Sequence, residues 1–535
     1  MELMPSAHVD SFCRDRLPPA DQWPEFRFDL PELHYPDRLN CATALLDDVI
    51  AEYGADRPCL LTPDGPTWTY GDLLATANRI AHALQNLGVV PGNRVLLRGP
   101  NNPWLAACWF GCLKAGAVAV TTMPLLRAGE LATIREIAAI DLALVDYRFL
   151  DDTTKLGAKV IEYGGEGGLT ALIEDVPIEF DDVATSADDV ALLAFTSGTT
   201  GRPKATMHFH RDVLAICDTF SRHVLRPTKD DLFTGTPPFA FTFGLGGVLL
   251  FPLYAGASTL LIERATPAEL AALIDAHQVT TCFTAPTAYK AMLAGGATLP
   301  SLRTGVSAGE HLPAATWQAF LDATGVRLID GIGATEMLHI FVSAAGDDIR
   351  PGSTGRAVPG FTVTVLDEDG NDAKPGEPGR LAVKGPTGCR YLADIRQRGY
   401  VRDGWNITGD TFVRDEEGYF WYQARSDDMI VSSGYNIAAP EVEEALLRHP
   451  EVAEVGVIGV PDEARGAIVK AFVVLTESAR ASAGPEKVRE LQDFAKAEIA
   501  PYKYPRAVEF VDSLPRTATG KLQRFRLRET AHEGR

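Results

Sequence analysis

Residues 195–206 read FTSGTTGRPKAT, and they follow a short apolar run, 190–194, that predicts a buried strand ending in a loop. Six consecutive positions supply four hydroxyl groups and two glycines: Thr196, Ser197, Gly198, Thr199, Thr200 and Gly201. Glycine lets the backbone come close to a ligand, so backbone N–H and side-chain O–H groups can converge there on one anion. Lys204 and Arg202 add positive charge. We therefore expect a phosphate-binding loop at the end of this strand.

A Walker-type phosphate loop has a different pattern, because it requires glycine before the lysine and serine or threonine after it. Pro203 and Ala205 stand at those two positions here. The alternative interpretation of the stretch, taken by itself, is a surface loop rich in serine, threonine and glycine. Three motifs farther along the chain favour the phosphate loop.

These motifs are, in chain order, Ile332-Gly-Ala-Thr335-Glu336, then Arg425-Ser-Asp427 with Gly434-Tyr435, and finally Pro515-Arg-Thr-Ala-Thr-Gly520-Lys521. Together with residues 196–204 they resemble the signature sequences of the adenylate-forming enzymes. That superfamily contains the acyl- and aryl-CoA synthetases, stand-alone adenylation domains and firefly luciferase. The resemblance covers most of the chain, and the motifs follow the order of the family.

The pattern of apolar residues indicates how the chain is divided. Helix-like and strand-like runs alternate from residue 70 to about 280, which is typical of parallel sheets covered by helices. After residue 355 the runs are short and interrupted by glycine and proline, which predicts β structure. With the resemblance, this predicts an α/β fold with a large N-terminal adenylation domain, 1–426. Two helix-covered sheets would occupy 1–354 and a small β-barrel 355–426, followed by a small mobile α+β domain, 427–535, with its hinge at Asp427.

Composition excludes several classes of protein. A net charge of −21 over 535 residues repels nucleic acid and anionic lipid, so any bound polyanion should be small and locally held. The eight cysteines show neither paired nor zinc-site spacing, and the N-terminus lacks the apolar core of a signal peptide, so a cytoplasmic protein is expected. Residues 243–262 carry no charge, but Pro252 and several glycines interrupt them. We interpret this run as a buried helix followed by a buried strand, without membrane insertion.

The resemblance implies a reaction in which ATP activates a carboxylate as an acyl-adenylate and releases pyrophosphate. Residues 196–201 and Lys204 would hold the leaving phosphates. Thr335 would contact the α-phosphate, and Glu336 would hold Mg²⁺, which prefers carboxylate oxygen. Taken alone, Thr335 and Glu336 would more simply cap a helix. Lys521 would be the catalytic cation of this first step, because a mobile ammonium can bridge the carboxylate and the α-phosphate.

The nucleoside would be held by residues from three motifs. Asp410 resembles the family carboxylate that accepts both ribose hydroxyls, with Arg425 as its partner; the alternative is an aspartate in a tight turn. Asp330 is a candidate partner for the adenine amino group. Gly331, Ile332 and Glu310 would complete the ATP site, with the aliphatic Ile332 at a position where many relatives place a tyrosine.

The second reaction would use CoA, whose pantetheine arm attacks the acyl-adenylate. In the family, the small domain rotates about a hinge that corresponds to Asp427, and this removes the catalytic lysine. Gly434 and Tyr435 would then face the pantetheine. The alternative for Asp427 is a plain surface turn.

The acid pocket is expected to be aromatic. Phe239, Phe241 and Phe243 alternate with Ala240 and Thr242, so on a strand the three rings would share one face. Such rings are more often core than pocket, and His339 is as well explained as a core histidine. The resemblance nevertheless places these residues with Ala308, Gly309 and Gly333 around an aryl ring, as in the benzoate and 2-aminobenzoate branch, and most like the 2-aminobenzoate ligases.

Two rival functions stay open at this point. The acyl group could pass to the pantetheine of a carrier protein instead of to free CoA. A non-catalytic nucleotide-binding regulator is disfavoured, because binding alone requires neither Lys521, Glu336 nor the hinge. ATP, Mg²⁺ and coenzyme A are the expected cofactors, and a small aromatic acid is the expected substrate.

Overall fold

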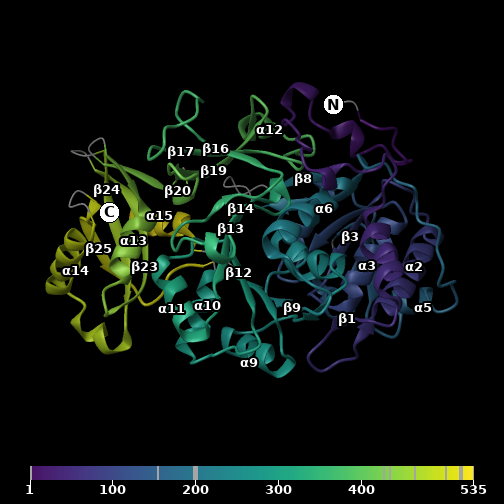
Figure 1. Cartoon of the computed structure of the whole chain (residues 1–535), viewed down its shortest axis with the longest axis horizontal. Coiled ribbons are helices and arrows are strands. Elements are labelled where there is room, and N and C mark those ends of the chain that lie inside the picture. Colours follow the sequence, from purple (N-terminus) through teal and green to yellow (C-terminus); the bar gives the residue numbers. More distant parts are fainter. Residues whose placement is uncertain are drawn as a thin grey trace. The chain divides into compact units, whose positions relative to one another are not determined.

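The computed structural model describes residues 3–153, 156–196, 203–425, 428–432, 435–462, 466–499, 503–516 and 522–533 (Figure 1). Contacts between Cα atoms divide the chain into two units. One unit comprises Met1–Val363 and Val383–Ile407, and the other comprises Thr364–Ala382 and Thr408–Arg535. Asp427 lies outside the described residues, so a domain boundary at that position stays a prediction.

The first unit contains a six-stranded sheet with the order β6-β5-β3-β4-β7-β8. Its strands are β3 (Arg94–Arg98), β4 (Val118–Thr122), β5 (Leu142–Asp146), β6 (Lys159–Tyr163), β7 (Val190–Thr196) and β8 (Lys204–Phe209). All neighbours pair in parallel except β7 and β8, which form an antiparallel pair. Strands β3 and β5 are buried along their whole length, as expected for a parallel sheet covered on both faces.

Helices α2 (Tyr70–Asn86), α3 (Pro103–Lys114), α4 (Ala128–Ala138) and α5 (Gly168–Leu172) accompany this sheet, and α2 and α3 pack side by side (Figure 1). The sequence sets where two of them begin. Thr69 and Asp72 form a reciprocal capping box at the start of α2. The side chain of Asn102 accepts a hydrogen bond from the N–H of Leu105 (2.9 Å), and Pro103 is the first residue of α3.

A nine-stranded sheet, also in the first unit, has the order β15-β14-β13-β12-β11-β9-β10-β1-β2. The parallel strands are β1 (Pro58–Leu61), β9 (Leu232–Gly235), β10 (Ser258–Leu261), β11 (Thr281–Thr284), β12 (Thr304–Ala308) and β13 (Leu328–Gly333). Strands β2 (Trp68–Thr69), β14 (Ile340–Ser343) and β15 (Arg356–Ala357) pair antiparallel at the edges. The first unit also contains helices α1 (Asp48–Tyr53), α9 (Pro267–His277), α10 (Pro286–Ala294) and α11 (Ala314–Thr324), whereas α6 (His210–Ile216) contacts β7 and β8 of the six-stranded sheet.

The uncharged run 243–262 folds as predicted. Helix α7 (Thr242–Gly244) continues through a π-helical segment, Leu245–Leu250, into α8 (Phe251–Tyr254), and strand β10 follows. In the part of the chain that the structure describes, no helix combines the length and apolar character needed to cross a membrane. The strand predicted for Phe239, Phe241 and Phe243 is wrong, because β9 ends at Gly235 and residues 236–241 form turns.

Residues 3–40 form an irregular segment with three 3₁₀ turns at Arg14–Arg16, Ala20–Gln22 and Pro31–Leu33. The N–H groups of Met4 and Ala7 donate to the carboxylates of Asp188 (3.0 Å) and Asp189 (2.9 Å), directly before β7. The eight cysteines are all buried free thiols.

The β-rich texture after residue 355 is confirmed. Strands β16 (Thr362–Leu366), β17 (Pro378–Lys384), β18 (Val401–Arg402), β19 (Trp405–Arg414) and β20 (Phe420–Arg425) form one sheet, with the short helix α12 (Gln397–Tyr400) before β18.

The second unit continues with a core of its own. A pair of strands, β21 (Met429–Ser432) and β22 (Tyr435–Ala438), precedes a three-stranded sheet of β23 (Val452–Asp462), β24 (Gly466–Leu475) and β25 (Ala507–Phe510). Helices α13 (Ala439–Leu447) and α14 (Pro485–Glu498) contribute to the same core. At the C-terminal end, Arg524–Glu533 form helix α15, and Arg524 makes an ion pair with Glu443 (2.7 Å).

Candidate active site

The segment 330–339 contains seven predicted site residues, all of them described by the structure: Asp330, Gly331, Ile332, Gly333, Thr335, Glu336 and His339. Strand β13 ends at Gly333, and Thr335–Met337 form a 3₁₀ turn before His339 leads into β14. Leu338 has a φ of 68°, which is costly for a residue with a branched side chain. This reversal lets Glu336 and His339, only three residues apart, contact two different groups of side chains.

Glu336 lies in a charged cluster. The ammonium of Lys204 lies 3.0 Å from its Oε1, and the two side chains are only 16% and 9% exposed. The hydroxyl of Tyr391 accepts a hydrogen bond from Lys204 and donates one to the same oxygen of Glu336. The ammonium also lies 4.3 Å from the centre of the Tyr391 ring. Two side chains predicted from sequence, Lys204 and Glu336, are thus brought together from the two sheets of the first unit.

Strand β8 positions this cluster. Lys204 and His208 are four residues apart on a strand, so their side chains project from the same face. Nε2 of His208 donates to the carbonyl of Thr335 (2.8 Å), which holds the 3₁₀ turn against β8. His208 was missed by sequence reasoning, because a histidine inside a strand gives no indication of a partner 127 residues away.

The predicted phosphate loop begins at the end of β7. Thr196 at the end of β7 pairs in register with Lys204 at the start of β8. Ser197, Gly198, Thr199, Thr200 and Gly201 lie outside the described residues, as do Asp427, Gly434 and Lys521. Their roles stay predictions.

The candidate adenine residues lie on β13 and after β12. Burial raises the pKa of the Asp330 carboxyl well above its usual range, and the N–H of Gly331 partly offsets this. Oδ1 of Asp330 has no hydrogen-bond partner among the described residues, which is notable for a buried polar atom. Ile332 and Glu310 are half-buried. Gly309, directly before Glu310, has a φ of 90°, a conformation that requires glycine.

His339 lies in an aromatic cluster. Its ring centre is 4.6 Å from that of Phe251, 5.3 Å from Phe220, 5.8 Å from Phe243 and 6.5 Å from Phe283. Burial lowers the pKa of His339 to about 3, although the Phe243 carbonyl opposes this shift. Neither ring nitrogen makes a hydrogen bond of normal geometry to a described residue. The imidazole is therefore neutral and keeps unused hydrogen-bonding capacity in an apolar setting.

The three phenylalanines predicted to line the pocket differ in burial and in their neighbours. Phe243 joins the aromatic cluster, whereas Phe239 is buried in the turn before α7 and Phe241 is half-buried. Asn101, which sequence reasoning missed, fixes this turn: its Nδ2 donates to the carbonyl of Pro237 (2.9 Å), and its Oδ1 accepts from the N–H of Phe239 (2.8 Å). Ala308 is buried at the end of β12, and Gly333 is exposed.

Asp410 and Arg425, the predicted ribose pair, belong to the second unit. They face each other in register across β19 and β20. Tyr435, predicted to face the pantetheine, is the first residue of β22.

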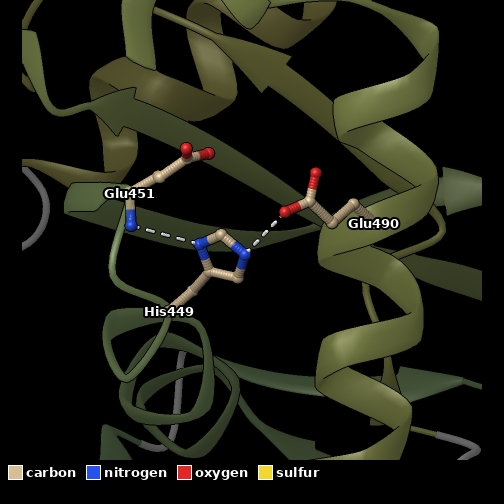
Figure 2. Close-up of side chains that lie close together, drawn as sticks. All are labelled: His449, Glu451 and Glu490. Atoms are coloured by element: carbon tan, nitrogen blue, oxygen red, sulfur yellow. Dashed lines mark hydrogen bonds and ion pairs between the residues drawn. The ribbon is translucent and has the colours of Figure 1, made fainter. Parts of the chain in front are cut away.

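The second unit also contains a group of metal-ligand type. Figure 2 shows His449 between Glu451 and Glu490, with Nδ1 accepting from the N–H of Glu451 (3.2 Å) and Nε2 donating to Glu490 (3.0 Å). Lys487 makes ion pairs with both carboxylates, and its hydrogen bond to Glu451 raises the pKa of its ammonium. Since a lysine already supplies the positive charge and both ring nitrogens are engaged, we interpret this group as a salt-bridge network.

Two family models match this sequence: AMP-binding enzyme over residues 46–391, and AMP-binding enzyme C-terminal domain over residues 441–521. The chain belongs to the AMP-binding enzyme family. This confirms the resemblance to the adenylate-forming enzymes and the α/β fold that it implied. The first match includes Lys204, Glu336 and His339 and ends at Tyr391, and the second ends at Lys521.

Individual members of the family are similar along almost the whole chain. The sequence is 35% identical over 518 residues to the benzoate–CoA ligase of Thauera aromatica, covering 93% of this chain and 97% of that one. The structure matches that of the anthranilate CoA ligase AuaEII in complex with anthranoyl-AMP with a TM-score of 0.88, at 34% identity and 94% and 99% coverage. It matches a benzoate CoA ligase from Burkholderia xenovorans LB400 with a TM-score of 0.84, at 33% identity and 92% and 100% coverage.

Proposed function

We propose that this protein is an ATP-dependent aryl-CoA ligase. It activates 2-aminobenzoate or benzoate as the acyl-adenylate, releases pyrophosphate, and transfers the acyl group to CoA with release of AMP. The observation that carries the proposal is the arrangement of segment 330–339, which joins a charged cluster at Glu336 to an aromatic cluster at His339. Similarity to benzoate and anthranilate CoA ligases along nearly the full chain supports the same activity.

The chemistry requires this combination of residues. A carboxylate is a poor electrophile, because its leaving group would be oxide, and both the acid and ATP are anions. Catalysis is therefore largely the neutralisation of charge at the phosphates. Lys204 would bind the leaving phosphates, Thr335 would contact the α-phosphate, and Lys521 would supply the transition-state cation. Asp410 and Arg425 would bind the ribose.

Glu336 fits a magnesium ion. It offers the hard carboxylate oxygen that Mg²⁺ prefers, and the Lys204 ammonium beside it shows that this position favours a cation. When bound, the ion would neutralise phosphate charge. Lys204 and Glu336 form an ion pair in this structure. This pair must break before Lys204 can bind the phosphates of ATP.

The aromatic cluster supports a planar ring as the substrate. His339 lies among four phenylalanines, and its ring nitrogens can hydrogen-bond an amino group on the ring of 2-aminobenzoate. A missing amino group would then cost about 1–3 kcal/mol, so benzoate should be a slower substrate rather than an inert one. Free CoA is the proposed acceptor, because the relatives named above are CoA ligases and none of their names mentions a carrier protein.

The test is pyrophosphate release measured with benzoate, the aminobenzoates, the hydroxybenzoates and fatty acids, followed by thioester formation with free CoA. We expect turnover of planar aryl acids and no useful turnover of dodecanoate. Comparable kcat/KM values for dodecanoate and 2-aminobenzoate would exclude the proposed pocket. Adenylation without thioester formation from free CoA would exclude CoA as the acceptor.

A further inference from the structure

The hydroxyl of Tyr391 joins the two charged residues of the candidate phosphate site. It accepts a hydrogen bond from the ammonium of Lys204 and donates its own proton to Oε1 of Glu336. Both partners of Glu336, the lysine and the tyrosine, thus contact Oε1, and Oε2 makes no hydrogen bond to any described residue. One carboxylate oxygen is held by the protein, and the other is left for a ligand.

Tyr391 is fixed in place by its surroundings. Its N–H donates to Oε1 of Gln397 (2.9 Å), and it bridges to Thr206 on β8, the strand that carries Lys204. The side chain is fully buried, and its ring lies 5.9 Å from that of Tyr400. An ordinary tyrosine phenol has a pKa of about 10, so the hydroxyl keeps its proton near neutral pH and remains a donor to Glu336.

We propose that Tyr391 is a positioning residue that orients Glu336 toward the metal bound with ATP. The inference rests on the proposed function of Glu336. In this structure, Lys204 and Tyr391 both contact Oε1 of Glu336. When the phosphates of ATP draw Lys204 away, the Tyr391 hydroxyl still donates to Oε1. Oε2 of Glu336 therefore keeps its orientation. Hydrogen bonds to a ligating carboxylate have this effect in metal sites, and their loss typically lowers metal affinity about 10- to 100-fold.

The measurement is the factor by which Mg²⁺ strengthens binding of α,β-methylene-ATP, obtained by calorimetric titration with and without the metal. It does not depend on turnover. For Tyr391→Phe, which removes one oxygen and keeps the ring, we expect this factor to fall about tenfold. Glu336→Gln should reduce it at least as much. In the double variant, the tyrosine change should add nothing, because it acts only through Glu336.

Tyr70→Phe is the matched control. Tyr70 is also fully buried, and its hydroxyl donates to the carbonyl of Ala257 (2.6 Å) without contact to Lys204 or Glu336. Its loss should lower the melting temperature and leave the Mg²⁺ factor unchanged. Should Tyr391→Phe not fold, Gln397→Met loosens the Tyr391 backbone without touching the phenol and should give a smaller fall in the factor.

Three results would overturn the proposal. The first is an unchanged Mg²⁺ factor in a folded Tyr391→Phe protein. The second is a fall in the factor that is as large when Tyr391→Phe is added to Glu336→Gln as when it is made in the wild type, and the third is an equal fall in the factor for Tyr70→Phe. Pyrophosphate release by the wild type on aryl acids is measured separately. If the wild type turns over no aryl acid while the Mg²⁺ factor behaves as expected, the proposed substrate is wrong and the role of Tyr391 stands.

Discussion

Replacing Asn101 with alanine should disturb the acid pocket without touching the phosphates. Asn101 is 4% exposed and makes two hydrogen bonds to the backbone of the turn before α7. Alanine leaves the N–H of the buried Phe239 without a partner and removes one partner from the half-exposed Pro237 carbonyl. An unsatisfied buried group costs about 1–3 kcal/mol and an ordinary hydrogen bond about 0.5–1.5 kcal/mol, so the ordered turn loses about 1.5–4.5 kcal/mol.

This loss should appear in the KM of the aryl acid. Phe243 follows the turn and contacts His339, so a loosened turn displaces one wall of the aromatic cluster. Because 1.4 kcal/mol corresponds to a factor of ten, we expect the KM for 2-aminobenzoate to rise at least about tenfold. The KM for ATP should stay within about twofold, since Asn101 makes no contact with Lys204, Glu336 or Tyr391.

Steady-state pyrophosphate release, with each substrate varied in turn, measures both constants. Asn78→Ala is the control: Asn78 is similarly buried, and its Nδ2 donates to the carbonyl of Ile178 (2.7 Å), away from the pocket turn. It should lower stability and leave both KM values unchanged. An equal rise in the two KM values for Asn101→Ala, or a rise no larger than in Asn78→Ala, would refute the assignment of this turn to the acid pocket.

Four further predictions test other parts of the site. Glu336→Gln keeps the shape of the side chain but removes its charge. The rate of adenylation should fall, and the Mg²⁺ concentration for half-maximal rate should rise. An unchanged dependence on Mg²⁺ would indicate that Glu336 only caps a helix. Lys521→Ala should raise the barrier to adenylation by a few kcal/mol, so the rate of pyrophosphate release should fall roughly 100-fold, while thioester formation from supplied acyl-adenylate should survive. Asp427→Pro should spare pyrophosphate release and lower thioester formation. Because burial holds the pKa of His339 near 3, its imidazole is neutral above pH 5, and the Kd of 2-aminobenzoate should be constant between pH 6 and 8.5. A change in the Kd of 2-aminobenzoate near pH 6.5 that disappears in His339→Asn would contradict the expectation of a neutral His339. In Gly246→Ala the new methyl carbon would lie 2.4 Å from Cδ2 of His339, so the ring must move and the aryl acid KM should rise with little change for ATP.

The architecture was largely predictable, because local patterns decide it. The capping box at Thr69 and the Asn-Pro start of α3 are short-range signals that survive in the folded chain. The error at residues 239–243 has a local cause that was also visible. Pro237 and Pro238 have no backbone N–H to donate to a β-sheet, so the alternating phenylalanines after them do not indicate a strand.

The candidate site was only partly predictable, since motifs name residues but not their neighbours. Lys204 and Glu336 came from two separate motifs, and the structure joins them. Tyr391 completes that cluster from 187 positions beyond Lys204, through a bridge to β8 that no local pattern encodes. Asn101 reaches the Phe239 turn across 138 positions in the same way. Such residues are found only when the strand order of the sheets is known.

The backbone at Leu338 separates the proposed phosphate site from the proposed acid pocket. Glu336 precedes this left-handed residue and contacts β8, whereas His339 follows it and contacts the helix that begins at Thr242. A substitution among the aromatic neighbours of His339 therefore need not disturb the lysine and tyrosine on Glu336, because the two groups share only the strained turn between them. Selection for a new acid can then act on α7, α8 and the residues after Leu338, provided that the turn itself keeps its conformation. The strain at Leu338 is consistent with that requirement, since an unfavourable φ persists only where the surrounding packing enforces it.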